Sequence, residues 1–194
     1  MTETRHTKRS PRSGRRRSVA AVVTIACAFA TVPAAAMTTG GASIIALVKA
    51  TPALKIDATV PPIGGWSAKT HPYVRVRNSE QTAGGAIDPD SASIGRLADG
   101  TQVMAVPLVS GGSGGVFTQI LFAQPDESGK PFYLGAITSG GHLGVNVTYH
   151  GVVAISPIYG PNDPNCCPSK YERRTYDVSG HALKLIARSE SAKP

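Results

Sequence analysis

Two adjacent cysteines are the most reactive side chains that this 194-residue chain places next to each other. Cys166 and Cys167 can close a strained disulfide ring, and strain makes a disulfide easier to reduce. A thiol oxidoreductase more often has C-x-x-C spacing, and structural zinc sites prefer spaced cysteine pairs. We therefore predict that Cys166 and Cys167 form a structural disulfide, as a vicinal ring or one intermolecular bridge. No metal and no cofactor is expected.

A second motif offers a serine nucleophile. Residues 111–115 read Gly-Gly-Ser-Gly-Gly and match G-x-S-x-G, with Ser113 in the centre. In α/β-hydrolases that serine lies on a tight turn between a strand and a helix, whereas here a strand-like run follows at 116–123. A triad would need partners from elsewhere in the chain, such as His142, His150, His181, Asp163 or Asp177. The turn composition favours a flexible hairpin connection.

The proline-rich segment around the cysteines is the candidate functional loop, and its members are Asp163, Asn165, Cys166, Cys167 and Lys170. A basic group follows it, made up of Lys170, Arg173 and Arg174. Such a group can meet anionic lipid or wall polymer, but Glu172 interrupts it and favours a solvated face.

Two other motifs have ordinary structural explanations. Asn146-Val147-Thr148 has the N-x-[ST] spacing, and a polar strand position explains it better than glycosylation. Trp66 follows Gly64-Gly65 and is expected to pack against the domain.

The positive charge of the chain is concentrated at its start. Six of the eight net positive charges come from the first 17 residues, and no charged residue occurs from 19 to 48. Residues 33–36 then read Pro-Ala-Ala-Ala. A basic start, an apolar run and small residues before a cleavage position predict a secretory signal peptide over residues 1–36, cleaved after Ala36. The remainder carries about +2, so no nucleic-acid partner is expected.

Two alternatives stay open for this segment. The apolar character continues to residue 48, so residues 19–48 also fit an uncleaved membrane anchor. Cys27 follows an alanine and is a lipidation candidate, with Thr24 where leucine is usual. In either case the chain meets the membrane through its N-terminal segment only.

Apolar runs separated by turn residues predict an antiparallel β domain. Strands are expected at 71–77, 102–109, 116–123, 131–137, 143–154, 171–178 and 182–187, with a hairpin around Ser179-Gly180. The 21 glycines and 15 prolines exclude a helical bundle and most α/β enzymes. The predicted fold class is mainly β, a single small antiparallel meander arranged as a sandwich or half-barrel behind the N-terminal signal or anchor.

The remaining parts of the chain are assigned around this domain. Residues 37–70 are predicted as a Gly/Pro-rich linker with a short helix at 43–50, and residues 71–188 as the β domain with a loop at 81–93. Residues 189–194 are predicted as a tail.

One stretch of the chain carries a family likeness. Residues 120–122 (Ile-Leu-Phe), 132–135 (Phe-Tyr-Leu-Gly) and 163–169 (Asp-Pro-Asn-Cys-Cys-Pro-Ser), with the closing strand pair around Tyr176, occur in succession. From about 101 to 187 the chain thereby resembles the LppP/LprE family of actinobacterial cell-envelope lipoproteins, although it has no typical lipobox. The resemblance implies an exported envelope protein with no established biochemical activity.

These observations predict an exported protein of a bacterial cell envelope, secreted or membrane-anchored. It is expected to be a non-enzymatic binding or structural module with a wall, lipid or protein partner. The alternative is a small exported hydrolase using Ser113, or a thiol-redox protein using Cys166 and Cys167.

Overall fold

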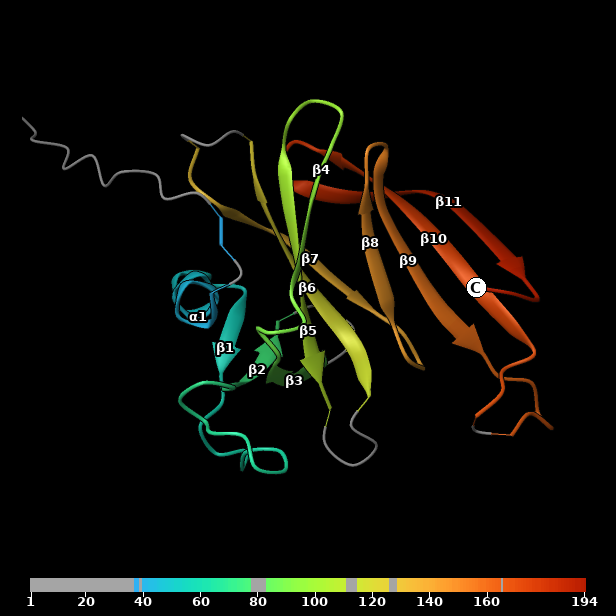
Figure 1. Ribbon diagram of the computed structural model, residues 1–194, viewed down its shortest axis with the longest axis horizontal. Helices are drawn as coiled ribbons and strands as arrows, with labels where there is room; N and C mark the ends of the chain where they lie inside the picture. Colours follow the sequence, from blue (N-terminus) through green and yellow to red (C-terminus); the bar gives the residue numbers. More distant parts are fainter. Residues whose placement is uncertain (1–36, 39, 78–82, 111–114, 126–128, 165) are drawn as a thin grey trace, which may run out of the picture. The chain divides into compact units, whose positions relative to one another are not determined.

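The computed structural model describes residues 37–38, 40–77, 83–110, 115–125, 129–164 and 166–194. These residues form a short helix and two antiparallel sheets (Figure 1), which confirms the predicted mainly β fold class. The predicted signal peptide, with Cys27 and Ala36, lies outside the described residues.

The first sheet has the strand order β1-β2-β3-β5-β6-β7, and β4 pairs with β5 beside this path. Its strands are β1 (Leu54–Ile56), β2 (Tyr73–Val76), β3 (Ala83–Ile87), β4 (Ser93–Arg96), β5 (Gln102–Val109), β6 (Val116–Gln124) and β7 (Phe132–Thr138). The second sheet is a meander with the order β11-β10-β9-β8. Its strands are β8 (Gly144–Thr148), β9 (Gly151–Ile158), β10 (Lys170–Ser179) and β11 (Ala182–Ser191).

Strand β5 is buried on both of its faces. Met104, Val106 and Leu108 enter one hydrophobic core, while Val103 and Ala105 enter a second core on the opposite face. Strand β6 divides its side chains between the two cores in the same way. A strand covered on both sides needs a nearly continuous apolar run, and the sequence shows one at 103–109 in β5 and a shorter one at 120–123 in β6.

The helix α1 (Gly41–Ala50) supplies part of the first core. Ile44 and Val48 lie four residues apart on one helix face and are both buried. The helix ends at Ala50, with Thr51 as its C-cap directly before Pro52, because a proline has no N–H for the next helical hydrogen bond. Within the described residues, no helix is both long enough and apolar enough to cross a membrane.

Residues 37–70 are predicted as a linker, and the structure contradicts this as far as Ile56, whereas residues 57–70 contain no helix or strand. The helix predicted at 43–50 is present, but its buried face and Leu54 of β1 pack in the first core. Strand β1 also pairs with β2 through Leu54–Val76 and Ile56–Val74. The density of glycine and proline concealed this, because the few apolar residues between the turns are the ones that are buried.

Two boundaries also differ from the prediction. Residues 81–93 were predicted as a loop, but β3 and the start of β4 lie there, and β3 pairs with β2 and β5. The predicted tail at 189–194 begins inside β11, which pairs with β10 as far as Ser191. Strand pairing with a distant partner, which a local pattern does not contain, orders both segments.

The predicted single strand at 143–154 is in fact a hairpin of β8 and β9. The expected alternation holds from Leu143 to Val147, and the chain then reverses at Tyr149 and His150. Gly151 has a φ of +140°, and a β-carbon there would meet the carbonyl oxygen of Tyr176. Only glycine suits that position. The position of the turn therefore depends on Gly151, and a search for alternating apolar residues does not detect it.

The two sheets share the second core. Val103, Ala105 and Leu121 of the first sheet pack with Val145 and Val152 of the second. Of the two predicted arrangements, a sandwich or a half-barrel, the described strands therefore form the sandwich. Gly95 of β4 approaches Val147 of β8 so closely that a β-carbon on Gly95 would lie 2.7 Å from Val147 Cγ1.

Replacing Gly95 with alanine is therefore expected to destabilise the protein. The added methyl group would push the sheets apart, at a cost of about 1–3 kcal/mol in the free energy of unfolding. Urea denaturation followed by circular dichroism measures this. Gly140→Ala is the matched control, because nothing lies within 4 Å of a β-carbon at Gly140. Equal stability of the two variants would contradict the close approach.

Candidate functional site

The outer face of the second sheet, turned away from the shared core, carries the candidate site. Strand alternation points Val145 and Val152 into the core and Asn146, Ile155 and Tyr171 away from it. A groove of about 410 Å³ opens on this outer face. Its lining consists of His142, Gly144, Asn146, Ile155, Pro157, Tyr159, Cys166, Pro168, Tyr171 and Pro194.

The loop between β9 and β10 forms one wall of the groove, and Asp163 holds it together. Its Oδ2 accepts hydrogen bonds from the backbone N–H of Gly160 (2.6 Å) and of Ser169 (2.7 Å). These two bonds favour the charged form, so they hold the pKa of the Asp163 carboxyl below its ordinary value. The backbone N–H of Cys167 also donates to the Pro164 carbonyl oxygen (2.9 Å). Asp163 therefore has a structural role in this loop.

The two cysteines of this loop have different surroundings. Both are exposed free thiols, not joined in a disulfide, in this structure, and Cys166 lines the groove. A hydrogen bond with the Cys166 thiol raises the pKa of the Cys167 thiol. The disulfide predicted from export to an oxidising space stays a prediction for the exported protein.

The other members of the predicted functional loop do not all reach the groove. Lys170 forms an ion pair with Glu190 on the neighbouring strand, with Nζ 3.3 Å from Oε2. Asn165 lies outside the described residues. Of the five predicted positions, Cys166 lies in the groove wall, and Asp163 holds together the loop that carries Cys166.

Sequence analysis missed the aromatic residues of the groove. Tyr159 and Tyr171 stand at the two ends of the proline-rich loop, and both line the groove. His142 joins them from the connection between β7 and β8, where its ring stacks on Phe117 at 5.7 Å between centroids. The sequence feature that indicates the two tyrosines is their position on either side of a loop rich in proline.

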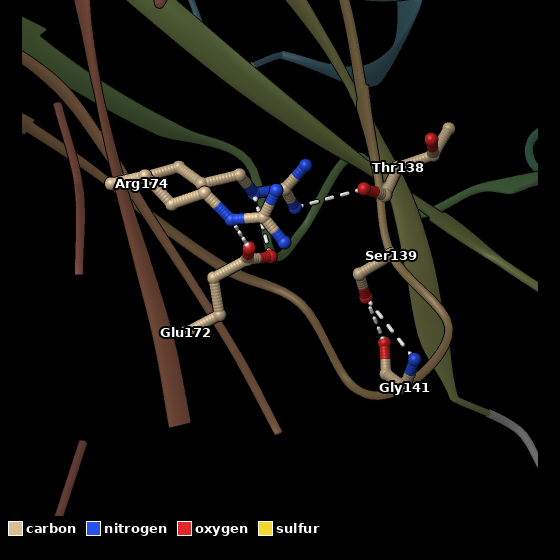
Figure 2. Close-up of polar contacts among 6 residues, drawn as sticks. Thr138, Ser139, Gly141, Glu172 and Arg174 are labelled. Carbon is tan, nitrogen blue, oxygen red and sulfur yellow. Dashed lines mark hydrogen bonds and ion pairs between the residues drawn. The ribbon is translucent and has the colours of Figure 1, made fainter. Parts of the chain in front are cut away.

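The inner face of the same sheet carries a cluster of charges (Figure 2). The Glu172 carboxylate lies between two guanidinium groups: Arg174 Nε is 3.3 Å from Oε2, and Arg188 Nε contacts Oε1. Arg174 also donates from Nη2 to the Thr138 carbonyl oxygen (2.8 Å), which ties β10 to β7 (Figure 2). A cleft of about 370 Å³ adjoins this cluster.

This cluster corrects the interpretation of Lys170, Arg173 and Arg174 as one solvated basic face. The Arg174 side chain is only 17% exposed and is paired with Glu172, because alternation along β10 turns it inward. Arg173 points outward and is exposed. The charges of Glu172 and Arg174 compensate each other, so we interpret the pair as structural.

The candidates for nucleophilic catalysis are distributed over the fold. Residues 110–115 connect two antiparallel strands, β5 and β6, and the Ser110 backbone N–H donates to the Gly115 carbonyl oxygen (3.0 Å). The element after the G-x-S-x-G segment is thus the strand β6, where an α/β-hydrolase has a helix, and Ser113 itself lies outside the described residues.

The three histidines considered for a triad lie on three different connections. His142 precedes β8, His150 is in the turn before β9, and His181 follows β10 and packs on Phe132 at 4.1 Å. His150 and Asp177 line one cleft of about 270 Å³. Among the described residues lining that cleft there is no serine, threonine or cysteine to act as a nucleophile.

Three metal-ligating side chains that sequence analysis did not connect lie together elsewhere. One ligand atom from each of His71, Asp88 and Asp90 lies within 4.8 Å of the other two. They come from the start of β2 and the end of β3, separated by 17 and 19 positions in the chain. Only the pairing of these strands brings them together.

Comparisons of this chain with models of protein families, with curated proteins and with solved structures found no match.

Replacing Asp163 with asparagine is expected to loosen the wall of the groove. An amide is a weaker acceptor than a carboxylate, so the Gly160 and Ser169 amide hydrogens should exchange with solvent faster, by roughly fivefold. Asp177→Asn is the control and should leave both rates unchanged. Hydrogen exchange read by NMR measures them, and equal rates in both variants would contradict the structural role of Asp163.

Low pH is expected to act on the same loop. The folded-state pKa of Asp163 lies below the ordinary value of 3.8, so its contribution to stability is fully present above that value. It is lost only as the pH falls through the lowered folded-state pKa. Protection of the Ser169 amide in the unmodified protein should therefore persist at pH 5 and decline only below the ordinary carboxyl pKa of 3.8.

Proposed function

We propose that this chain is an exported protein of a bacterial cell envelope, related to the LppP/LprE family, that acts as a non-enzymatic binding module. The support for export is the separation of charge at the N-terminus, where a basic segment precedes an uncharged apolar run and Pro-Ala-Ala-Ala. The support for the family is the Asp-Pro-Asn-Cys-Cys-Pro-Ser segment within residues 101–187.

The groove on the outer face of the second sheet carries the proposal of binding. It combines aromatic and proline surfaces with a few polar groups, the Asn146 amide, the His142 ring and the tyrosine hydroxyls. Ligand sites commonly pair an apolar lining with a small number of polar groups that set orientation. Gly144 lies in the lining without a side chain to fill the groove.

The lining also favours one class of partner. None of the described lining residues is a lysine, arginine, aspartate or glutamate, whereas recognition of anionic lipid relies on lysine and arginine. Tyrosine rings can pack on the apolar faces of sugar rings, while amide, imidazole and hydroxyl groups bond to sugar hydroxyls. An uncharged wall polysaccharide therefore fits the groove better than an anionic lipid surface.

Export is expected to yield a mature chain that begins at Met37. The full chain is expressed in an actinobacterium, and intact mass is measured on protein from culture fluid and from membranes. A lipid-modified mass beginning at Cys27 would keep the envelope location and move the processing site. A chain beginning at Met1 and confined to the cytoplasm would contradict export.

Removal of one tyrosine ring is expected to weaken binding to the wall. We expect Tyr171→Ala to reduce the affinity of the exported protein for purified wall polysaccharide by roughly fivefold or more, measured by co-sedimentation. Tyr149→Ala is the matched control, because Tyr149 is 64% exposed but lies at the other end of β8 and does not line the groove. Equal binding by both variants, or no binding by the unmodified protein, would contradict the proposed site.

A further inference from the structure

A second site lies on the first sheet, where β2 begins and β3 ends. Tyr73 pairs with Ala86 in the ladder, and the Ile87 backbone N–H donates to the Pro72 carbonyl oxygen (3.1 Å), so His71 lies opposite Asp88. Asp90 follows two positions later. One ligand atom of each of the three residues lies within 4.8 Å of the other two, so small side-chain rotations bring all three onto a single ion.

The His71 ring is held from two sides. Its face stacks on Trp66, with 4.2 Å between ring centroids and 17° between planes. Its Nδ1 lies 2.9 Å from Thr70 Oγ1. The same hydroxyl lies 3.3 Å from the Ser67 carbonyl oxygen. When it donates its hydrogen to Ser67, it accepts from the Nδ1–H of His71, and the lone pair is then on Nε2, the state in which a histidine ligates metal.

The arrangement around Nδ1 is the one that metal-binding histidines use. A ligating histidine almost always donates its other ring N–H to a neighbouring oxygen, and this bond sets the tautomer and the ring orientation. Here Thr70 provides the oxygen, although it lies outside the cluster of possible ligands. The ring is thus oriented without help from either aspartate.

The two carboxylates are carried by a constrained turn. The Asp88 backbone N–H donates to the Pro107 carbonyl oxygen of β5 (3.0 Å), and the Ala92 N–H donates to the Pro89 carbonyl oxygen (3.2 Å). Pro89 itself is buried between the two aspartates. Asp88 is half-buried and Asp90 is exposed, so the cluster lies at the surface and is open to ions from solvent.

We propose that His71, Asp88 and Asp90 bind a divalent transition-metal ion, with Zn²⁺ as the representative. One imidazole nitrogen and two carboxylate oxygens suit such an ion, whereas Ca²⁺ takes six to eight oxygen ligands. The two negative charges balance the charge of the ion. Three protein ligands leave a coordination position for water, and His71 also lines a cavity of about 50 Å³, which is large enough for a water molecule.

Trp66 makes this site directly measurable. It is the only tryptophan of the chain, and it stacks on the proposed ligand His71. Binding of paramagnetic Co²⁺ at the cluster should quench the Trp66 emission, and Zn²⁺ should displace Co²⁺ and restore it. The measurement uses the chelator-treated exported protein carrying Cys166→Ser and Cys167→Ser, because exposed thiols also bind these ions.

We expect saturable quenching with one ion per chain. His71→Gln and Asp88→Asn should each lower the affinity for Co²⁺ by at least roughly tenfold. That is the smallest loss expected even for a residue that only supports a ligand. His181→Gln and Asp177→Asn are the matched controls and should leave the affinity unchanged. Zinc should also raise the unfolding temperature of the cysteine-free protein but not that of Asp88→Asn.

Asp90→Asn provides a variant that is expected to fold, because Asp90 is exposed, and circular dichroism verifies folding of each variant. Loss of Zn²⁺ binding in folded Asp90→Asn supports the site. Absence of quenching in the cysteine-free protein would overturn the proposal. Equal quenching in the cluster variants and the controls would also overturn it, as would tighter binding of Ca²⁺ than of Zn²⁺.

Discussion

Burial of β5 and β6 on both faces is the constraint on which the rest of the fold depends. A strand with apolar side chains on both sides exposes one of them to water unless two separate layers cover it. On one side the cover is α1 with the strands near it, and on the other side it is the meander β8 to β11. This requirement explains why apolar residues of the segment 37–56 are part of the core.

The same constraint determines where binding chemistry can lie. The second sheet uses one face to cover β5 and β6, which leaves its outer face free for a ligand, and the groove opens there. Where the inner face extends beyond the apolar core, Glu172 and Arg174 replace hydrophobic side chains and tie β10 to β7 through Thr138. The wall of the groove depends in turn on Asp163, whose carboxylate binds both ends of the loop that carries Cys166.

The sequence located the proline-rich loop as a candidate, but it did not assign the roles within it. Asp163 is one of the candidate residues of this loop, and in the structure its carboxylate accepts from two backbone N–H groups. Tyr171 and His142 were not predicted for the groove, because they reach it from different elements and share no local motif. His71 and Asp88 escaped detection for the same reason: a strand pair, and no sequence spacing, makes them neighbours.

What the sequence determined by itself is local: the apolar runs of β5 and β6, the helix at 43–50, the hairpin at Ser179-Gly180 and the N-terminal pattern typical of export signals. These features depend on backbone geometry and on neighbours within a few positions. Only the tertiary structure decided that 143–154 is a hairpin, that Arg174 points inward and that His71 meets Asp88. The physical reason is that burial and strand pairing join residues far apart in the chain, and a side chain's partner depends on which strand lies next to its own.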